Sequence, residues 1–246
     1  MSLFYADAFV QLFHGDCYEI LPTVSADVVV TDPPYGLLAD SGKVHMGGGV
    51  VNEADWGEWD RVASWDWLAL CQGIVAAVVF HDHKDATRAW EGLAAVGVPP
   101  RQFLYWDKGD SGLNPRRNFV NCVEQAIYGR RGTSPWNGGA ITPNILRVNR
   151  APTPDHPTQK PIALMSRILR VVTDVGTMVL DPFAGSGSTL VAAKVLGRKS
   201  IGIEIDEKYC EIAARRISMT NFQEVLPWED EPIQQSWLGT DETVDG

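Results

Sequence analysis

The sequence lacks the features that mark several large classes of protein. It has four cysteines in 246 residues, scattered without a Cys-x-x-Cys pair, so we expect neither a disulfide framework nor a zinc cluster. No apolar run approaches the roughly 20 residues that cross a bilayer, and the first residues show no basic segment leading into an apolar one. These absences predict a cytoplasmic protein with no membrane partner.

A general excess of positive charge is lacking too. The formal net charge is −10, which taken alone disfavours binding to nucleic acid. The charge is uneven, however: residues 101–170 contain 11 basic and 4 acidic side chains, whereas residues 224–246 contain no basic and 7 acidic ones. A local positive field can steer a polyanion, so residues 101–170 are a candidate nucleic-acid surface. An ordinary solvated face is the alternative.

The spacing of apolar residues predicts an α/β fold. Short apolar runs indicate strands at residues 9–14, 27–31, 74–80, 102–106, 122–128, 178–181 and 200–204. Helical spacing covers residues 63–73, 84–95, 162–172, 188–196 and 207–218. Strands that alternate with helices imply a mostly parallel sheet with helices on both faces. We expect one domain over residues 1–223, with a mobile loop at 36–62, and a flexible acidic tail at 224–246.

Asp32-Pro33-Pro34-Tyr35 directly follows the apolar run of residues 27–31. Such a strand places a carboxylate, proline carbonyls and a flat ring together at the carboxyl edge of a sheet. The prolines fix φ and lack N–H groups, so the turn is stiff and its carbonyls can accept hydrogen bonds from a ligand. That geometry suits the amino edge of adenine or cytosine. A plain strand followed by a proline turn is the alternative.

A second pattern lies near the other end of the chain. The expected strand that ends at Asp181 leads into Pro182-Phe183-Ala184-Gly185-Ser186-Gly187, and another expected strand ends at Glu204. Glu204 follows Gly187 by 17 residues (187 to 204), close to the ~20-residue offset at which an acid meets a ribose in nucleotide-binding units. A nicotinamide-binding loop is the alternative, but the third glycine of its fingerprint is missing.

Together these segments resemble the amino-group DNA methyltransferases that use S-adenosylmethionine. The order of motifs, with Asp-Pro-Pro-Tyr first and Phe-x-Gly-x-Gly last, is similar to that of the β subgroup. Residues 156–161, His-Pro-Thr-Gln-Lys-Pro, are a third landmark, and Trp106-x-Lys108 followed by Phe119 and Glu124 is a weaker fourth. The resemblance implies a Rossmann-like class I methyltransferase fold with a circularly permuted motif order.

The resemblance also implies a reaction. The catalytic candidates are Asp32, Pro33, Pro34 and Tyr35: the Asp32 carboxylate and the Pro33 carbonyl would accept both hydrogens of an adenine N6 amino group, and Tyr35 would stack on the base after it flips out of double-stranded DNA. Aspartate at position 32 favours adenine, because cytosine-N4 members more often carry serine there. Cytosine-N4 methylation remains the alternative within the class. A non-catalytic DNA-binding regulator that retains the fold is the alternative from another class.

S-adenosylmethionine would need several kinds of contact. Glu204 is the candidate for the ribose hydroxyls, Asp16 for the adenine amino group, and Asp181 for the methionine ammonium. The methionine carboxylate would meet Thr158 and Lys160. The two turn glycines let the backbone approach the cofactor. The full set of cofactor candidates is Asp16, Asp181, Phe183, Gly185, Gly187, Glu204, Thr158 and Lys160.

DNA contacts are expected within residues 109–155, the candidate target-recognition segment, from its arginines: Arg116, Arg117, Arg130, Arg131, Arg147 and Arg150. The segment is short, so either the recognition site is short, or a homodimer or another partner supplies further contacts. Residues 36–62 could close over the flipped base, whereas Trp65 and Trp67 are expected to pack the domain. His81-x-His83 could suggest a metal, but without a third ligand nearby we expect surface or capping residues and no metal.

Overall fold

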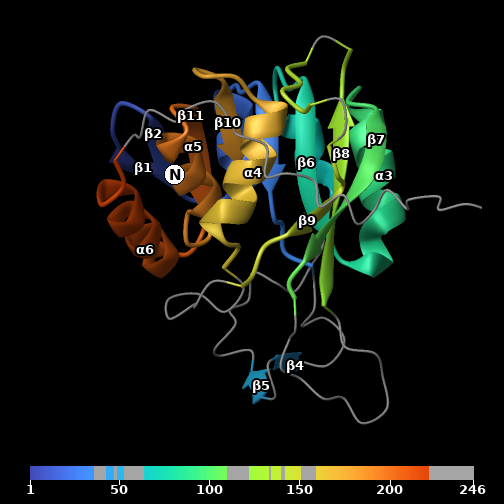
Figure 1. Cartoon of the computed structure of the whole chain (residues 1–246). Coiled ribbons are helices and arrows are strands. Elements are labelled where there is room, and N and C mark those ends of the chain that lie inside the picture. The colour runs from blue at the N-terminus through green and yellow to red at the C-terminus, as the bar shows by residue number, and fades with distance from the viewer. Residues whose placement is uncertain are drawn as a thin grey trace, which may run out of the picture.

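The computed structural model describes residues 1–35, 64–109, 122–132, 134–139, 142–150 and 159–221, and the backbone of 43–46 and 49–52. Its main feature is a nine-stranded sheet (Figure 1). In spatial order the strands are β1 (Ser2–Ala6), β2 (Val10–His14), β11 (Lys199–Glu204), β10 (Met178–Asp181), β3 (Val28–Thr31), β6 (Ala76–His81), β8 (Val123–Arg130), β7 (Pro100–Asp107) and β9 (Ile145–Arg147). A separate pair is formed by β4 (Lys43–Met46) and β5 (Gly49–Asn52).

The five strands from β2 to β6 in this order are parallel. β8 runs antiparallel to both β6 and β7, and β1 antiparallel to β2. The centre of the sheet therefore has all its carboxyl ends at one edge. There β3, from the start of the chain, pairs with β10, which comes about 150 residues later. The predicted mostly parallel α/β fold with permuted motif order is confirmed.

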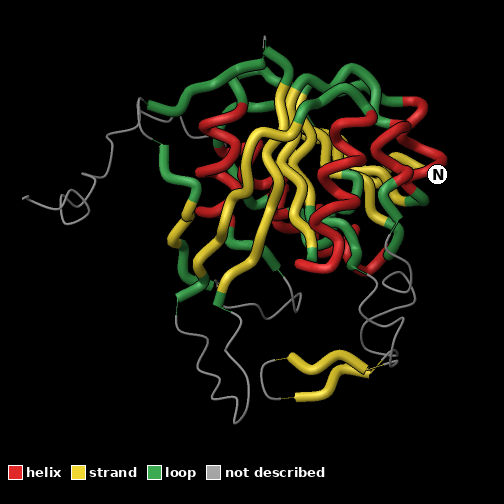
Figure 2. The backbone as a smooth tube through the Cα atoms, turned by 90° about the vertical axis from the view of Figure 1, so that its right-hand side faces the viewer, coloured by secondary structure: helices red, strands yellow, loops and turns green. Residues whose placement is uncertain are grey.

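Helices cover both faces of this sheet, which Figure 2 shows from a second side. They are α1 (Cys17–Ile20), α3 (Ala86–Ala95), α4 (Ile162–Val172), α5 (Ser188–Val195) and α6 (Glu207–Ser218), with 3-10 turns η1 (Leu21–Thr23), η3 (Asp66–Leu70) and η4 (His83–Asp85). Among the described residues, no helix has the length and apolarity that a membrane crossing requires.

Alternating residues of the central strands belong to two separate hydrophobic clusters, one on each face of the sheet. Val28 and Val30 of β3 pack with α4 and α5 on one face, while Val29 packs with η3 and α3 on the other. Every residue of β3 and β6 is buried, because a central parallel strand is covered on both sides. This explains why these strands read as continuous apolar runs in the sequence.

The expected helices at 162–172 and 207–218 are confirmed at both ends. The helix predicted at residues 63–73 is wrong. The described part of this segment contains only the short 3-10 turn η3, which places Trp67 and Leu68 in the core. The packing role expected for Trp67 is confirmed, and Trp65 packs beside it. Strand β9 is missing from the strands predicted from the sequence, because its three residues are too few to show a periodicity.

The glycine turn between β10 and α5 depends on backbone conformations that other residues rarely adopt. Gly185 has φ of 51° and Gly187 has φ of 80°, and Gly187 is the N-cap of α5. A Cβ added at Gly187 would lie 2.9 Å from the Cβ of Ala213 in α6. The glycine therefore permits both the turn and the close approach of two helices.

Substitution of Gly187 by alanine tests this packing. Gly176→Ala is a matched control, because Gly176 also has φ of 85° but open space where its Cβ would be. We expect Gly176→Ala to lower the free energy of unfolding by about 1–2 kcal/mol through backbone strain alone. Gly187→Ala should lose about 1–3 kcal/mol more through overpacking. Urea unfolding measures both, and equal losses would contradict the packing explanation.

Candidate active site

The carboxyl edge of the parallel strands gathers the acidic residues that the sequence analysis singled out. Asp16 follows β2, Glu204 ends β11, Asp181 ends β10 and Asp32 follows β3, and these strands are neighbours in that order. The hydroxyl of Thr31 donates a hydrogen bond of 2.6 Å to Oδ1 of Asp181. The two sequence patterns thus meet at one edge of the sheet.

Asp32 stands at one end of a row of alternating charges. Its carboxylate accepts hydrogen bonds from the hydroxyl of Tyr35 and from Nζ of Lys160. Nζ of Lys160 also lies 3.1 Å from Oε2 of Glu124, and Oε1 of Glu124 accepts a 3.2 Å hydrogen bond from Nζ of Lys108. We call Asp32, Lys160, Glu124 and Lys108 the charge row.

Burial and neighbouring charges set the protonation states in the charge row. Burial by itself would lower the pKa of Lys160, but the carboxylates of Asp32 and Glu124 outweigh it and raise that pKa above its usual value. Burial would raise the pKa of Glu124, yet the two lysines hold it below its usual value. Lys160 and Glu124 therefore both stay charged at neutral pH.

Tyr35 is a neutral hydrogen-bond donor to this site. Its ring packs against the hydrophobic cluster on the α4 side of the sheet. Burial, followed by the nearby carboxylates of Asp32 and Glu124, holds the pKa of its hydroxyl well above the usual value. Tyr35 therefore remains protonated and orients one oxygen of Asp32.

Glu204 forms the other half of the site, beside the glycine turn. Its side chain is 8% exposed; Oε2 accepts the N–H of Gly185 at 2.7 Å, and Oε1 accepts the N–H of Asp206 at 2.9 Å. Burial raises the pKa of Glu204 to about 7. A carboxylate has about four acceptor positions, so two remain for the vicinal hydroxyls of a ribose. These acceptor positions fit the ribose hydroxyls of S-adenosylmethionine.

The other cofactor candidates are placed differently from one another. Asp16 is exposed and caps α1 by accepting the N–H of Tyr18 at 2.9 Å. Asp181 is 3% exposed, and its Oδ1 accepts both Thr31 and the N–H of Phe183; burial raises its pKa to about 6. Asp16 thus borders the site, whereas Asp181 joins its two halves from within. Phe183 packs edge-on against the ring of Trp67.

Gln159 and Lys160 connect the two halves of the site. Oε1 of Gln159 accepts a 3.2 Å hydrogen bond from the hydroxyl of Ser186 in the glycine turn, while the next side chain, Lys160, contacts Asp32. Lys160 therefore lies in the charge row, and the expected contact with the methionine carboxylate has no support from this geometry. Thr158 lies outside the described residues.

Sequence reasoning did not assign a role to Gln159 or to Arg216, whose Nη1 lies 2.8 Å from the hydroxyl of Ser186. Gln159 belongs to the His-Pro-Thr-Gln-Lys-Pro motif at residues 156–161, so the sequence did indicate that its position matters. Arg216 had no such signal, because its contact depends on how α6 packs against the glycine turn.

The candidate arginines lie at two opposite edges of the sheet. Arg147 ends β9, 3.5 Å from Asp107, and Arg150 follows as an exposed residue at the edge that carries Asp32. Arg130 ends β8, which runs antiparallel to β6, so Arg130 and Arg131 lie at the far edge. There the guanidinium of Arg131 donates to the carbonyls of Gly97 and Val96 after α3.

The structure therefore does not bring Arg130 and Arg131 to the site. Their position depends on the direction of β8, which no pattern in the sequence predicts. Arg116 and Arg117 lie outside the described residues, as do the expected tail at 224–246 and most of the loop at 36–62.

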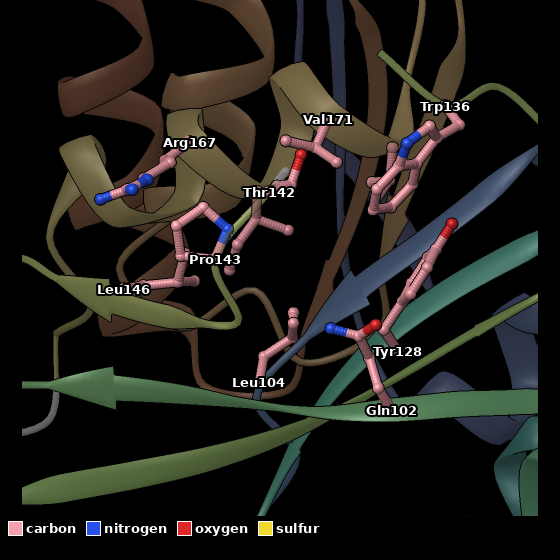
Figure 3. Close-up of a pocket in the computed structure, with 11 residues that line it drawn as sticks. Gln102, Leu104, Tyr128, Trp136, Thr142, Pro143, Leu146, Arg167 and Val171 are labelled. Atoms are coloured by element: carbon pink, nitrogen blue, oxygen red, sulfur yellow. The ribbon is translucent and has the colours of Figure 1, made fainter. Parts of the chain in front are cut away.

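An apolar pocket lies between α4 and the strands β7, β8 and β9 (Figure 3). Leu104, Tyr128, Trp136 and Val171 line it, and the rings of Tyr128 and Trp136 are tilted by 31° with their centroids 5.6 Å apart. Its lining has no carboxylate and no thiol. This pocket therefore lacks the charged groups that distinguish the charge row, and the edge around Asp32 and Glu204 remains the candidate active site.

A Rossmann-like sheet with an Asp-Pro-Pro-Tyr turn beside a glycine turn defines an amino-group DNA methyltransferase that uses S-adenosylmethionine. Comparison with known proteins agrees. The sequence model of the N6/N4 DNA methylases matches residues 82–215, more than half of the chain. The chain belongs to this family.

Two curated relatives match most of the chain. The type II methyltransferase M2.DpnII of Streptococcus pneumoniae is 28% identical over 256 residues, covering 85% of this chain and 90% of its own. The type II methyltransferase M2.LlaDCHI of Lactococcus lactis subsp. cremoris is 27% identical, with coverages of 84% and 88%.

Solved structures share the fold. The complex of M1.HpyAVI with SAM is 26% identical, with a TM-score of 0.65, and covers 84% of this chain and 99% of its own. PvuII DNA methyltransferase, described as cytosine-N4-specific, has a TM-score of 0.67 at 19% identity, with coverages of 87% and 88%. At that identity the second match speaks for the fold alone.

The raised pKa of Glu204 predicts that the affinity for the cofactor depends on pH. Ribose hydroxyls donate to an ionised carboxylate, but burial keeps Glu204 half protonated near pH 7. Between pH 8 and pH 6, we expect the affinity for S-adenosylmethionine to fall about five- to tenfold. Titration calorimetry on the intact protein and on Glu204→Gln measures this.

Glu204→Gln should bind more weakly at every pH and should lose the part of the pH dependence that Glu204 causes. Taking the ratio of the two affinities at each pH removes any titration of the cofactor itself. A ratio that stays constant from pH 6 to pH 8 would contradict the assignment.

Proposed function

We propose that this protein is a site-specific DNA methyltransferase that transfers a methyl group to the N6 amino group of adenine in duplex DNA. The observation that carries the proposal is the hydrogen bond between Thr31 and Asp181. It fixes the acceptor turn, beginning at Asp32, next to the strand that leads into the glycine turn. An amino group held at one and a methyl donor held at the other would be neighbours.

S-adenosylmethionine supplies, when bound, a methyl group already activated by its sulfonium. The residues of this chain act on the acceptor. The Asp32 carboxylate and the Pro33 carbonyl accept the two amino hydrogens, which directs the nitrogen lone pair away from the ring system and toward the methyl group. The N–C bond would form as the bond between the methyl carbon and the sulfonium sulfur breaks, which leaves a neutral thioether. The amino nitrogen would lose one of its two hydrogens as a proton, which passes to water by way of the Asp32 carboxylate. Positioning and preorganised acceptors supply most of the rate enhancement, and no covalent bond to the enzyme is needed.

The target base would leave the duplex before it reacts. Asp32 follows a strand within a continuous sheet, where a base that remains stacked in a helix could not reach it. Extruding a base costs a few kcal/mol, which stacking on Tyr35 and contacts to phosphates would offset. Arg147 and Arg150 are the described arginines that we propose for such contacts, because they share the edge of the sheet with Asp32.

The wider setting is also proposed from the comparisons. The relatives named as type II methyltransferases support sequence-specific modification of DNA as part of a restriction-modification system. We propose one catalytic domain over residues 1–223, the β subgroup by motif order, and a homodimer that would supplement the short recognition segment at 109–155.

Cytosine-N4 methylation is the second candidate, for a specific reason. Adenine and cytosine present the same amino edge, and the acceptors Asp32 and Pro33 would hold either. The choice of adenine comes from the aspartate at position 32, a preference within the family.

The test is to express the protein in a methylation-free bacterial strain and to sequence the DNA by a method that distinguishes N6-methyladenine from N4-methylcytosine. We expect methyladenine in one discrete sequence motif. Methylcytosine in a motif would select the second candidate, and unmodified DNA from a folded protein that binds S-adenosylmethionine would contradict both.

Asp32→Ala should abolish the mark, with a loss in rate of at least about a hundredfold, while the affinity for S-adenosylmethionine stays within a few-fold. Asp66→Ala is the control, because Asp66 is an exposed carboxylate in η3, and this variant should methylate normally. A large loss of cofactor affinity in Asp32→Ala would mean that Asp32 serves the cofactor instead of the base.

A further inference from the structure

We infer that Lys160 is a positioning residue for methyl transfer: it holds the Asp32 carboxylate in the orientation that accepts the amino group, and Glu124 in turn fixes Lys160. The inference rests on the proposed function, since it assigns a task within the same site. It differs from the role that the sequence suggested for Lys160, which was to bind the methionine carboxylate.

The surroundings of Lys160 hold its side chain in one position. The side chain is 6% exposed, and its ammonium group lies 5.0 Å from the ring centroid of Phe80 and 6.0 Å from that of Trp106. Two of its three N–H groups are directed to Asp32 and Glu124. Aromatic faces on its flanks and carboxylates on both sides hold the ammonium at Asp32.

Asp32 needs such a partner because of the other charges around it. Among the described residues, carboxylates of Asp181 and Glu124 act on this part of the site, and Asp82 follows the neighbouring strand β6. Like charges favour the neutral form of a carboxyl group, and a cation beside it favours the charged form. Lys160, with Lys108 behind Glu124, is the positive charge that offsets these acids.

The ionised form matters for the reaction. A neutral carboxyl group carries its own O–H, which would meet the amino hydrogens of the base with a donor in place of an acceptor. The hydroxyl of Tyr35 occupies one oxygen of Asp32 and Lys160 the other. The carboxylate is thereby fixed in rotation, and its remaining acceptor positions are available to the amino group.

Glu124 connects two lysines that come from separate segments. It lies near the start of β8 and holds both Lys108, which follows β7, and Lys160, which precedes α4. Without Glu124 the ammonium of Lys160 would lose one of its two anchors. Loss of the Glu124 charge would also remove a like charge near Asp32, whereas loss of Lys160 would remove the opposite charge that contacts it.

The test is the rate of methyl transfer in a single turnover, with saturating S-adenosylmethionine and enzyme in excess over DNA, measured from pH 5 to pH 9. Lys160→Met should reduce the rate at pH 7.5 by about a hundredfold and should move the acid limb of the pH profile upward by about one pH unit or more. Lys160→Arg, which keeps the charge, should restore the position of the acid limb. Glu124→Gln should move the acid limb downward.

Lys194→Met is the matched control for the loss of a buried lysine. Lys194 donates to Asp7 at 2.6 Å and to the carbonyl of Ile217 at 2.9 Å, away from the site, so its loss should lower stability and leave the acid limb in place. Should Lys160→Met fail to fold, the downward shift in Glu124→Gln and the unchanged limb in Lys160→Arg still test the inference.

The contrary results are distinct. An acid limb that stays in place in Lys160→Met and Glu124→Gln, or a tenfold or greater loss of S-adenosylmethionine affinity in Lys160→Met with an unchanged single-turnover rate, would overturn the inference. A folded wild-type protein that methylates no DNA would overturn the proposed function itself.

Discussion

The site depends on one buried joint, the pairing of β3 with β10 and the hydrogen bond from Thr31 to Asp181 that closes it. In the function proposed above neither half of the site would serve alone, because the turn at Asp32 would supply acceptors for an amino group and the glycine turn a place for the cofactor. The joint brings them together although about 150 residues separate them in the chain. Residues of both strands are buried in the hydrophobic clusters on the two faces of the sheet.

This edge concentrates carboxylates, and the fold accommodates them in two ways. Asp181 and Glu204 are buried without a cation beside them in the described contacts, and burial raises their pKa values to about 6 and about 7. Asp32 and Glu124 instead alternate with Lys160 and Lys108. Burying charges is unfavourable for stability, but fixed charges and dipoles at a reacting centre need no reorganisation during the reaction. The charge row fits a site in which some stability is lost so that fixed charges lie beside the reacting group.

Much of this arrangement could be predicted from the sequence. The strand before Asp32, the glycine turn and the helices at 162–172 and 207–218 follow from local periodicity and turn chemistry, and the order of motifs resembles a known family. The features that the sequence did not reveal depend on long-range geometry. The direction of β8 decides that Arg130 and Arg131 lie at the far edge, and the partner of Lys160 lies 128 residues away in the sequence. No local pattern contains either fact.

The central claim is that the methyl donor and the acceptor turn share one edge of the sheet. The most direct measurement is a crystal structure of the protein with S-adenosylmethionine bound. The account predicts the ribose at Glu204 and the methyl group facing Asp32, with space for one amino nitrogen at the roughly 3–3.5 Å separation of a reactive pair. A cofactor bound elsewhere, or one whose methyl group points away from Asp32 with protein side chains between them, would contradict it.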